Sequence, residues 1–178
     1  MQMIARPLAP DAFAPFGQVI EKGLGESFPI NGGQCTRHHA LAAAEVTGEG
    51  AQVVVSIFEA EPYELPLALP LVERHPLGSQ AFFPLDAKRW LVICFEDEGG
   101  LPVRGQAFLA RGDQGVQIAR NVWHAVLTPL DGRADFIVVD RAGPGANLEE
   151  HHFDERPVVT LPGALPGALP GALPGALP

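Results

Sequence analysis

The sequence ERHPLGSQAF at Glu73–Phe82 decides the fold class. It contains the end of one run that favours β-strand, Leu71–His75, and the start of another, Gln80–Pro84. The residues between them, Pro76–Ser79, include Pro, Gly and Ser, which favour turns. Most connections in the chain are similarly too short for a crossover helix, so the strand pairing is expected to be largely antiparallel.

Outward from this stretch, short β-favouring runs bounded by Gly, Pro, Asp or Asn recur in both directions, whereas long stretches with helical apolar spacing are scarce. That rhythm is typical of an all-β sandwich or barrel. We expect short helical turns at Asp11–Phe16 and Leu41–Val46. The other expected strands are Gln18–Glu21, Gln52–Phe58, Arg89–Phe95, Gly105–Ala110, Val116–Ala119, His124–Leu127 and Asp135–Asp140.

One folded domain is expected over residues 1–160. A chain of 178 residues, 47% of them hydrophobic, can build one core, whereas two domains would be cramped. His151 and His152, near the end of this domain, are expected to be solvated. Residues 161–178 read LPGALPGALPGALPGALP, and a Pro at every fourth position is incompatible with a regular helix or a central strand. We expect a disordered low-complexity tail, with an interaction arm as the alternative.

The charge pattern excludes several classes of partner. The net charge is -9 and the acidic residues are scattered, so no basic face is offered to nucleic acid or to an anionic membrane surface. The longest apolar runs are far shorter than a membrane span, and the first residues lack a signal-peptide pattern. Cys35 and Cys94 have no CxxC spacing and suggest no disulfide framework. We therefore expect a cytoplasmic protein that acts on a small molecule.

Two histidines, His75 and His124, stand at the ends of expected strands, where a rigid sheet can present a side chain to the mouth of a cavity. Imidazole is well suited to carry protons near neutral pH, although a single histidine is more often structural. The alternating pleat places Glu73 on the same face as His75 and turns Arg74 to the opposite face. The segments around both histidines are therefore the candidate site.

The spacing Glu73-x-His75-x4-Gln80, with His124 in a second segment, resembles the metal-ligand pattern of the cupin barrel. A cupin has a histidine where this chain has Glu73 and a carboxylate where it has Gln80. Two histidines and one carboxylate can still bind a divalent metal, with nickel favoured here over zinc or iron. The alternative is a metal-free pocket in which the same side chains act as acid, base and hydrogen-bonding groups.

Four separated segments carry a closer resemblance, to the bacterial ureidoglycolate lyase family. They are INGGQCTRHHALA at 30–42, ERHPLGSQAF at 73–82, GDQGVQIARNVWH at 112–124 and VVDRAG at 138–143. The resemblance implies a cupin-like (RmlC-like) antiparallel β-barrel or jelly roll that forms a homodimer. It also implies cleavage of (S)-ureidoglycolate to glyoxylate and urea, a step in the degradation of purines through allantoin.

That reaction needs a base for the hydroxyl proton and an acid for the departing urea nitrogen, and in principle it needs no cofactor. His75 or His124 is expected to be the base, with the other histidine or a bound metal polarising the leaving group. Glu73 could be a metal ligand, a group that orients a histidine, or the base itself. Which residue takes the proton stays open at this point.

The substrate offers a carboxylate and a ureido group for recognition. An arginine can clamp a carboxylate with two hydrogen bonds, and a primary amide matches the donors and acceptors of a ureido group. The alternative is a surface ion pair for each arginine, and turn formation for Asn31, which precedes two glycines. The candidate arginines are Arg74, Arg120, Arg37 and, with lower rank, Arg141; the candidate amides are Gln80, Asn121 and Asn31; and His39 matches a histidine of the family.

Two other functions fit the same residues. A metal-dependent cupin of another class, such as an isomerase or dioxygenase, would use Glu73, His75, Gln80 and His124 strictly as ligands. A non-catalytic module would bind a small acid without turning it over. A product assay also separates a lyase, which releases urea, from an amidohydrolase, which releases ammonia.

Overall fold

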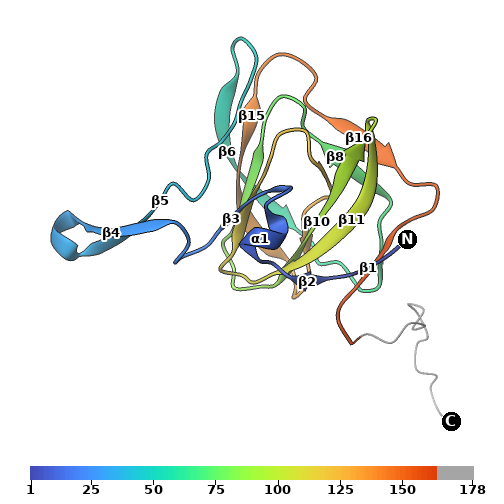
Figure 1. Cartoon of the computed structure of the whole chain (residues 1–178), viewed down its shortest axis with the longest axis horizontal. Coiled ribbons are helices and arrows are strands. Elements are labelled where there is room, and N and C mark those ends of the chain that lie inside the picture. Colours follow the sequence, from blue (N-terminus) through green and yellow to red (C-terminus); the bar gives the residue numbers. More distant parts are fainter. Residues whose placement is uncertain (164–178) are drawn as a thin grey trace.

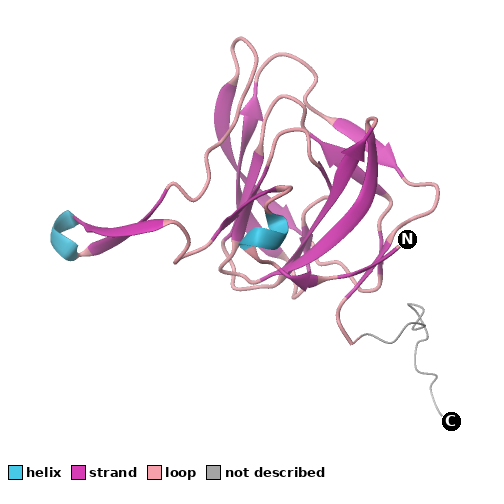
Figure 2. Ribbon diagram, in the orientation of Figure 1, coloured by secondary structure: helices cyan, strands magenta, loops and turns pink. Residues whose placement is uncertain are grey.

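The computed structural model describes residues 1–163 and is almost entirely β-structure (Figure 1 and Figure 2). Two sheets, called here the large sheet and the five-stranded sheet, pack against each other as a cupin-like sandwich. The all-β prediction is thus confirmed. In the described part the α-helix α1 (Pro10–Phe13) overlaps the helical turn expected at Asp11–Phe16. The predicted tail lies outside the described residues from position 164 onward.

Both main sheets combine strands from distant parts of the chain, and most neighbours run antiparallel. In spatial order the large sheet contains β16 (Glu149–His152), β8 (Leu71–Arg74), β13 (Trp123–His124), β10 (Trp90–Glu98), β11 (Leu101–Ala110) and β2 (Arg6–Pro7), with β14 (Thr128–Pro129) paired to β10. The five-stranded sheet contains β3 (Gly17–Ile20), β12 (Gly115–Ile118), β9 (Gln80–Pro84), β15 (Ala134–Ala142) and β6 (Gln52–Ala60). A smaller sheet joins β1 (Gln2–Ile4), β17 (Val158–Thr160) and β7 (Leu67–Ala68).

The main core lies between the two large layers. Phe82 and Phe136 enter it from the five-stranded sheet, and Trp90 and Phe108 enter it from the large sheet. The rings of Trp90 and Phe136 pack edge-on with their centroids 5.1 Å apart. Aromatic side chains at strand spacing therefore fill this core, as burial of their large apolar area favours.

The first part of strand β10 (Trp90–Phe95) is buried on both of its faces. Every second residue from Trp90 to Cys94 belongs to the main core, and the residues between them belong to a second core covered by the small sheet of β1, β17 and β7. This two-sided burial explains why WLVICF at 90–95 is apolar throughout, whereas a half-exposed strand alternates.

The turn at Pro76–Ser79 links the two layers of the sandwich. Strand β8 belongs to the large sheet and β9 to the five-stranded sheet, so the strands on either side of the turn do not pair with each other. The side chains that β8 and β9 direct inward consequently face one space from two sheets. The candidate site lies there.

The expected helical turn at Leu41–Val46 is wrong. This segment runs extended past β9 and β12, and Val46 forms a β-bridge with Gly78. Ser79 donates its backbone N–H to the Glu45 carbonyl oxygen at 2.8 Å. These contacts with distant strands satisfy the backbone better than a single isolated helical turn, which is costly to nucleate.

Two further expectations need correction. The strand expected at His124–Leu127 is interrupted, because β13 ends at His124 and pairing with β10 resumes only at Thr128. His151 is not part of a solvated tail: β16 pairs with β8, and the His151 ring packs 5.1 Å from Phe153. His152, by contrast, is exposed.

A hairpin projects from the sandwich (Figure 1). It consists of β4 (Glu26–Ile30), the 3-10 turn η1 (Asn31–Gly33) and β5 (Cys35–His39). No helix in residues 1–163 is long and apolar enough to cross a membrane.

Candidate active site

Glu73, His75 and His124 meet at the inner face of the large sheet. Strands β8 and β13 pair antiparallel with His124 directly across from Glu73. One carboxylate oxygen, Glu73 Oε1, lies 3.8 Å from His75 Nε2 and 3.7 Å from His124 Nε2. The pairing of two short strands thus brings Glu73 and His75 next to His124, which lies 49–51 positions further along the sequence.

Backbone carbonyls fix the orientation of both imidazole rings. His75 Nδ1 lies 2.8 Å from the Asn147 carbonyl oxygen, and His124 Nδ1 lies 3.0 Å from the Val122 carbonyl oxygen. A carbonyl can only accept a hydrogen bond, so each Nδ1 carries the hydrogen and each Nε2 presents a lone pair. Both Nε2 atoms are buried and lack a hydrogen-bond partner in the described part of the chain.

Burial also sets the protonation of the cluster. Removal from water lowers the pKa of His124 to about 4, so its imidazole is neutral at pH 7. Burial raises the pKa of Glu73 above its usual value of 4.5, against the opposing attraction of His75. The site therefore combines the neutral imidazole of His124 with a carboxyl group that binds a proton more readily than an exposed glutamate does.

A cavity of about 330 Å³ opens beside this cluster. Glu73 enters it from the large sheet, and Gln80 enters it from the five-stranded sheet. Like the two imidazole nitrogens, the Oε1 atom of Gln80 is buried and has no hydrogen-bond partner among the residues that the structure describes. The remaining lining residues are Phe58, Glu59, Ala60, Tyr63, Phe82, Val126 and Leu127.

Arg74 points away from this cavity. As strand alternation predicted, it lies on the other face of β8, where its guanidinium contacts Asp97 and Glu149 at 2.7 Å. It also stacks 4.4 Å from the centre of the Trp123 ring. The structure thus places this candidate carboxylate clamp in an ion-pair network outside the cavity.

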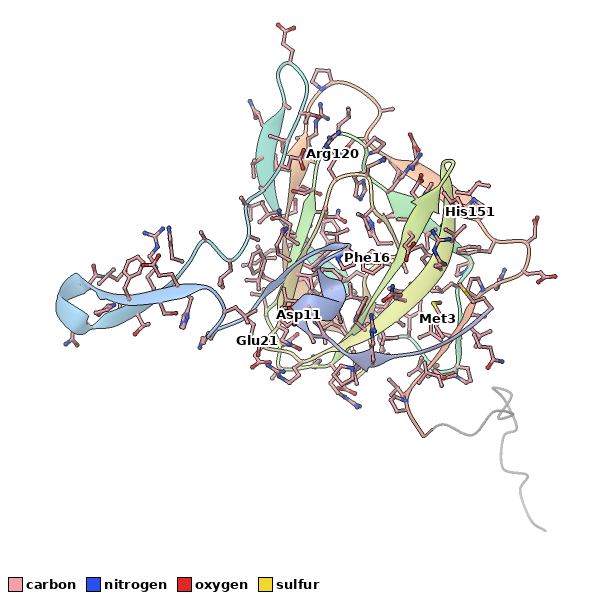
Figure 3. All side chains as sticks on the ribbon, viewed as in Figure 1. Met3, Asp11, Phe16, Glu21, Arg120 and His151 are labelled. Carbon is pink, nitrogen blue, oxygen red and sulfur yellow. The ribbon has the colours of Figure 1, made fainter. Side chains whose placement is uncertain are left out.

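Arg120 and Asn121 support the turn that carries His75. Arg120 donates hydrogen bonds to the Pro76 carbonyl oxygen at 3.0 Å and to Glu45 at 2.9 Å, and Figure 3 labels its side chain near the loops of the sandwich. The backbone N–H of Asn121 donates to the His75 carbonyl oxygen at 2.9 Å. Asn121 has a φ of 66°, a left-handed conformation that asparagine tolerates well.

The remaining candidates are not brought to the Glu73 cluster. Asn31 lies in the turn of the β4–β5 hairpin, and His39 packs against Phe28 within that hairpin. Arg37 lines a separate cavity of about 480 Å³ between the hairpin and the outer face of the five-stranded sheet. Arg141 is buried, and its guanidinium donates hydrogen bonds to the carbonyl oxygens of Thr47, Gly143 and Pro144.

Comparison with known proteins places the chain in a family. The family model for ureidoglycolate lyase matches residues 1–160. The chain is 55% identical over 161 residues to a protein named ureidoglycolate lyase from Chelativorans sp. (strain BNC1), covering 90% of this chain and 98% of that protein. It is 53% identical over 157 residues to another from Agrobacterium fabrum, covering 88% and 95%.

The chain belongs to the ureidoglycolate lyase family. The sequence-based assignment to this family is therefore confirmed. Within a ureidoglycolate lyase fold, the cluster of Glu73, His75 and His124 also fits a divalent metal, because their potential ligand atoms all lie within 4.8 Å of one another. Such an ion is commonly bound by two imidazole nitrogens and one carboxylate. Here the Nδ1 atom of each ring is held by a backbone carbonyl, which orients the Nε2 atom toward the ion.

Three residues at this candidate site were not predicted from the sequence. Asn147 holds His75 through its backbone oxygen and accepts the Leu77 N–H on its side chain at 2.8 Å. Asp140 contacts Gln80, and Tyr63 lines the cavity. No local signal marks them, because each reaches the site from a loop or strand distant from the histidine segments.

Proposed function

We propose that the protein cleaves (S)-ureidoglycolate to glyoxylate and urea in the degradation of purines through allantoin. Its family membership supports the substrate, and the curated relatives carry the name of this activity. The observation that carries the proposal is the convergence of Glu73, His75 and His124 beside a cavity of about 330 Å³. That space is large enough for a small molecule such as ureidoglycolate.

The proposed chemistry balances within the substrate. The hydroxyl proton leaves, the C–O bond becomes a carbonyl, the C–N bond breaks, and the urea nitrogen takes up a proton. We assign the proton transfer to Glu73, because it lines the cavity and its raised pKa makes it a stronger base than an exposed glutamate. The hydroxyl and the nitrogen share one carbon, so one carboxyl group can serve both.

The buried His124 is a poor choice for the base, because its pKa of about 4 disfavours protonation at neutral pH. In the alternative, its neutral Nε2, together with His75 Nε2 and Glu73, would hold a divalent ion, and Glu73 would then be a ligand instead of the base. Such an ion supplies Lewis-acid polarisation of substrate oxygen atoms. We propose nickel ahead of zinc or iron; the general affinity order of divalent metals places Ni²⁺ above Fe²⁺ for a given site, and metal analysis of the purified protein decides.

We also propose that the protein is a homodimer. Val53, Val55 and Ile57 form an apolar row on the outer face of β6, an edge strand, and all three side chains are exposed. The projecting β4–β5 hairpin has little core of its own, and an isolated hairpin is marginally stable. A second copy would cover such a row and support such a hairpin. The cytoplasmic location of the protein stays a prediction from its sequence.

A product assay tests the proposed reaction. The purified protein is incubated with each enantiomer of ureidoglycolate, and glyoxylate, urea and ammonia are all measured. We expect glyoxylate and urea in equal amounts and no ammonia from the S enantiomer. Release of ammonia would assign an amidohydrolase, and binding without turnover would assign a non-catalytic module.

A further inference from the structure

The amide of Gln80 has a defined orientation because of one neighbour. Gln80 Nε2 lies 3.5 Å from an oxygen of the Asp140 carboxylate. A carboxylate only accepts hydrogen bonds, so it favours the amide nitrogen over the amide oxygen at this position. The reversed amide would place Oε1 against the carboxylate, where two acceptors repel each other.

The strand register supports this contact. Strands β9 and β15 pair antiparallel with Val138 across from Phe82 and Val139 across from Ala81. One step further along the same register, Asp140 comes across from Gln80. Both side chains share the inner face of the sheet with Phe82 and Val138, which are core residues.

The consequence is an acceptor without a donor. Gln80 is 6% exposed, it lines the cavity beside Glu73, and its Oε1 atom is buried with no hydrogen-bond partner among residues 1–163. A buried unpaired acceptor is costly, so it marks a position where a ligand donor belongs. The products of the proposed reaction differ in this respect, since urea has N–H donors and glyoxylate has none.

We propose that Asp140 is a positioning residue that holds the Gln80 amide with Oε1 toward the ligand, and that this oxygen accepts an N–H of the ureido group. The inference rests on the proposed function and identifies the residue pair that recognises the ureido group of the substrate. Gln80 thereby selects a substrate with a ureido N–H at this position. A substrate with an acceptor there, such as a second carboxylate, could not form a hydrogen bond with Oε1.

Product inhibition separates this role from a general effect on folding. The inhibition constants of urea and of glyoxylate are measured for the wild type, Asp140→Asn and Gln80→Met. The asparagine can donate to Oε1 and so permits the reversed amide, whereas methionine removes the acceptor. We expect the inhibition constant of urea to rise about three- to tenfold in each variant, with that of glyoxylate changed less than about twofold.

The matched control is Asp135→Asn. Asp135 lies on the same strand, β15, an odd number of residues from Asp140, so its side chain takes the opposite face. This control should leave both inhibition constants unchanged. An equal rise for urea and glyoxylate in Asp140→Asn would indicate a merely structural role and would overturn the proposal.

The double variant tests whether Asp140 acts through Gln80. In the Gln80→Met background, Asp140→Asn should add nothing to the urea effect, since no amide remains to be oriented. A further rise of the same size would show independent action and contradict the inference. If the wild type itself released no glyoxylate, the proposed function would fail instead, and the same series would be compared by NMR titration with urea.

Discussion

At the scale of residues, the two imidazole rings of the candidate site are hydrogen-bonded at Nδ1 and unpaired at Nε2 among the described residues. His75 and His124 each donate from Nδ1 to a backbone carbonyl, and each leaves Nε2 unpaired near Glu73. Such outer contacts fix the tautomer and aim the lone pair. The same three side chains can hold a metal or handle a proton, and substitutions distinguish these uses.

Substitution of either histidine should remove metal and activity together. His75→Asn and His124→Asn each delete one nitrogen ligand, and we expect metal affinity and kcat/KM to fall by more than about 100-fold, beyond the usual effect of losing an outer contact. Metal content by mass spectrometry and glyoxylate release are the measurements. The exposed His152→Asn serves as the control. Normal activity in metal-free wild type would exclude a metal requirement.

The buried His124 should make the metal-free protein sensitive to acid. Its folded pKa of about 4 lies below the unfolded value of 6.5, so the unfolded chain binds a proton first as the pH falls. The stability is complete above pH 6.5 and is lost toward pH 4. Between pH 7.5 and 4 the wild type should lose about 3 kcal/mol more than His124→Asn in urea unfolding. Parallel losses in both proteins would refute this assignment.

At the scale of elements, strand pairing decides which faces carry chemistry. Strand β8 directs Glu73 inward, while its neighbour Arg74 joins β8, β10 and β16 through Asp97 and Glu149 on the other face. Trp123 donates its ring N–H to the same Asp97 at 3.0 Å. One strand thus contributes separately to the site and to the stability of the large sheet.

Arg74→Ala should therefore weaken the fold without weakening substrate binding. The side chain of Arg74 is 14% exposed and makes two ion pairs and a stacking contact, so we expect a loss of about 1–3 kcal/mol in unfolding free energy. KM should change less than about twofold. Arg104→Ala, which removes exposed ion pairs with Glu96 and Glu98, should change little. A large rise in KM would instead restore Arg74 as the carboxylate clamp.

At the scale of the whole molecule, the two sheets face each other while the outer side of the five-stranded sheet remains uncovered along β6. Val55 and Ile57 are 69% and 66% exposed there. Apolar residues in a row on an edge strand are unusual in a protein that stays monomeric. This surface is consequently the place to test the proposed homodimer.

Val55→Glu together with Ile57→Glu should halve the mass measured by light scattering, because two like charges would meet an apolar partner face. The control is Leu101→Glu, an exposed apolar residue on β11. Its mass should match that of the wild type. A monomeric wild type would contradict the homodimer. A charged variant that stays dimeric would place the interface on another surface.

Much of the molecule could be predicted from local patterns. Apolar and polar alternation with short Gly- and Pro-containing turns predicted the all-β class, and the expected strands are present with shifted ends apart from the interrupted one after His124. The segment at Leu41–Val46 was predicted wrongly, because alanine-rich composition favours helix while its real partners, Gly78 and Ser79, are distant. The hairpin at β4 and β5 was not predicted.

Local patterns were enough to predict the fold class, the family, and the placement of Glu73 and His75 on one face of a strand, since strand alternation is a local property of the backbone. The folded arrangement was needed to show that His124 lies across from Glu73, that Arg74 forms ion pairs outside the cavity, and that Asp140 contacts Gln80. These contacts depend on strand register between distant segments, which local sequence does not specify.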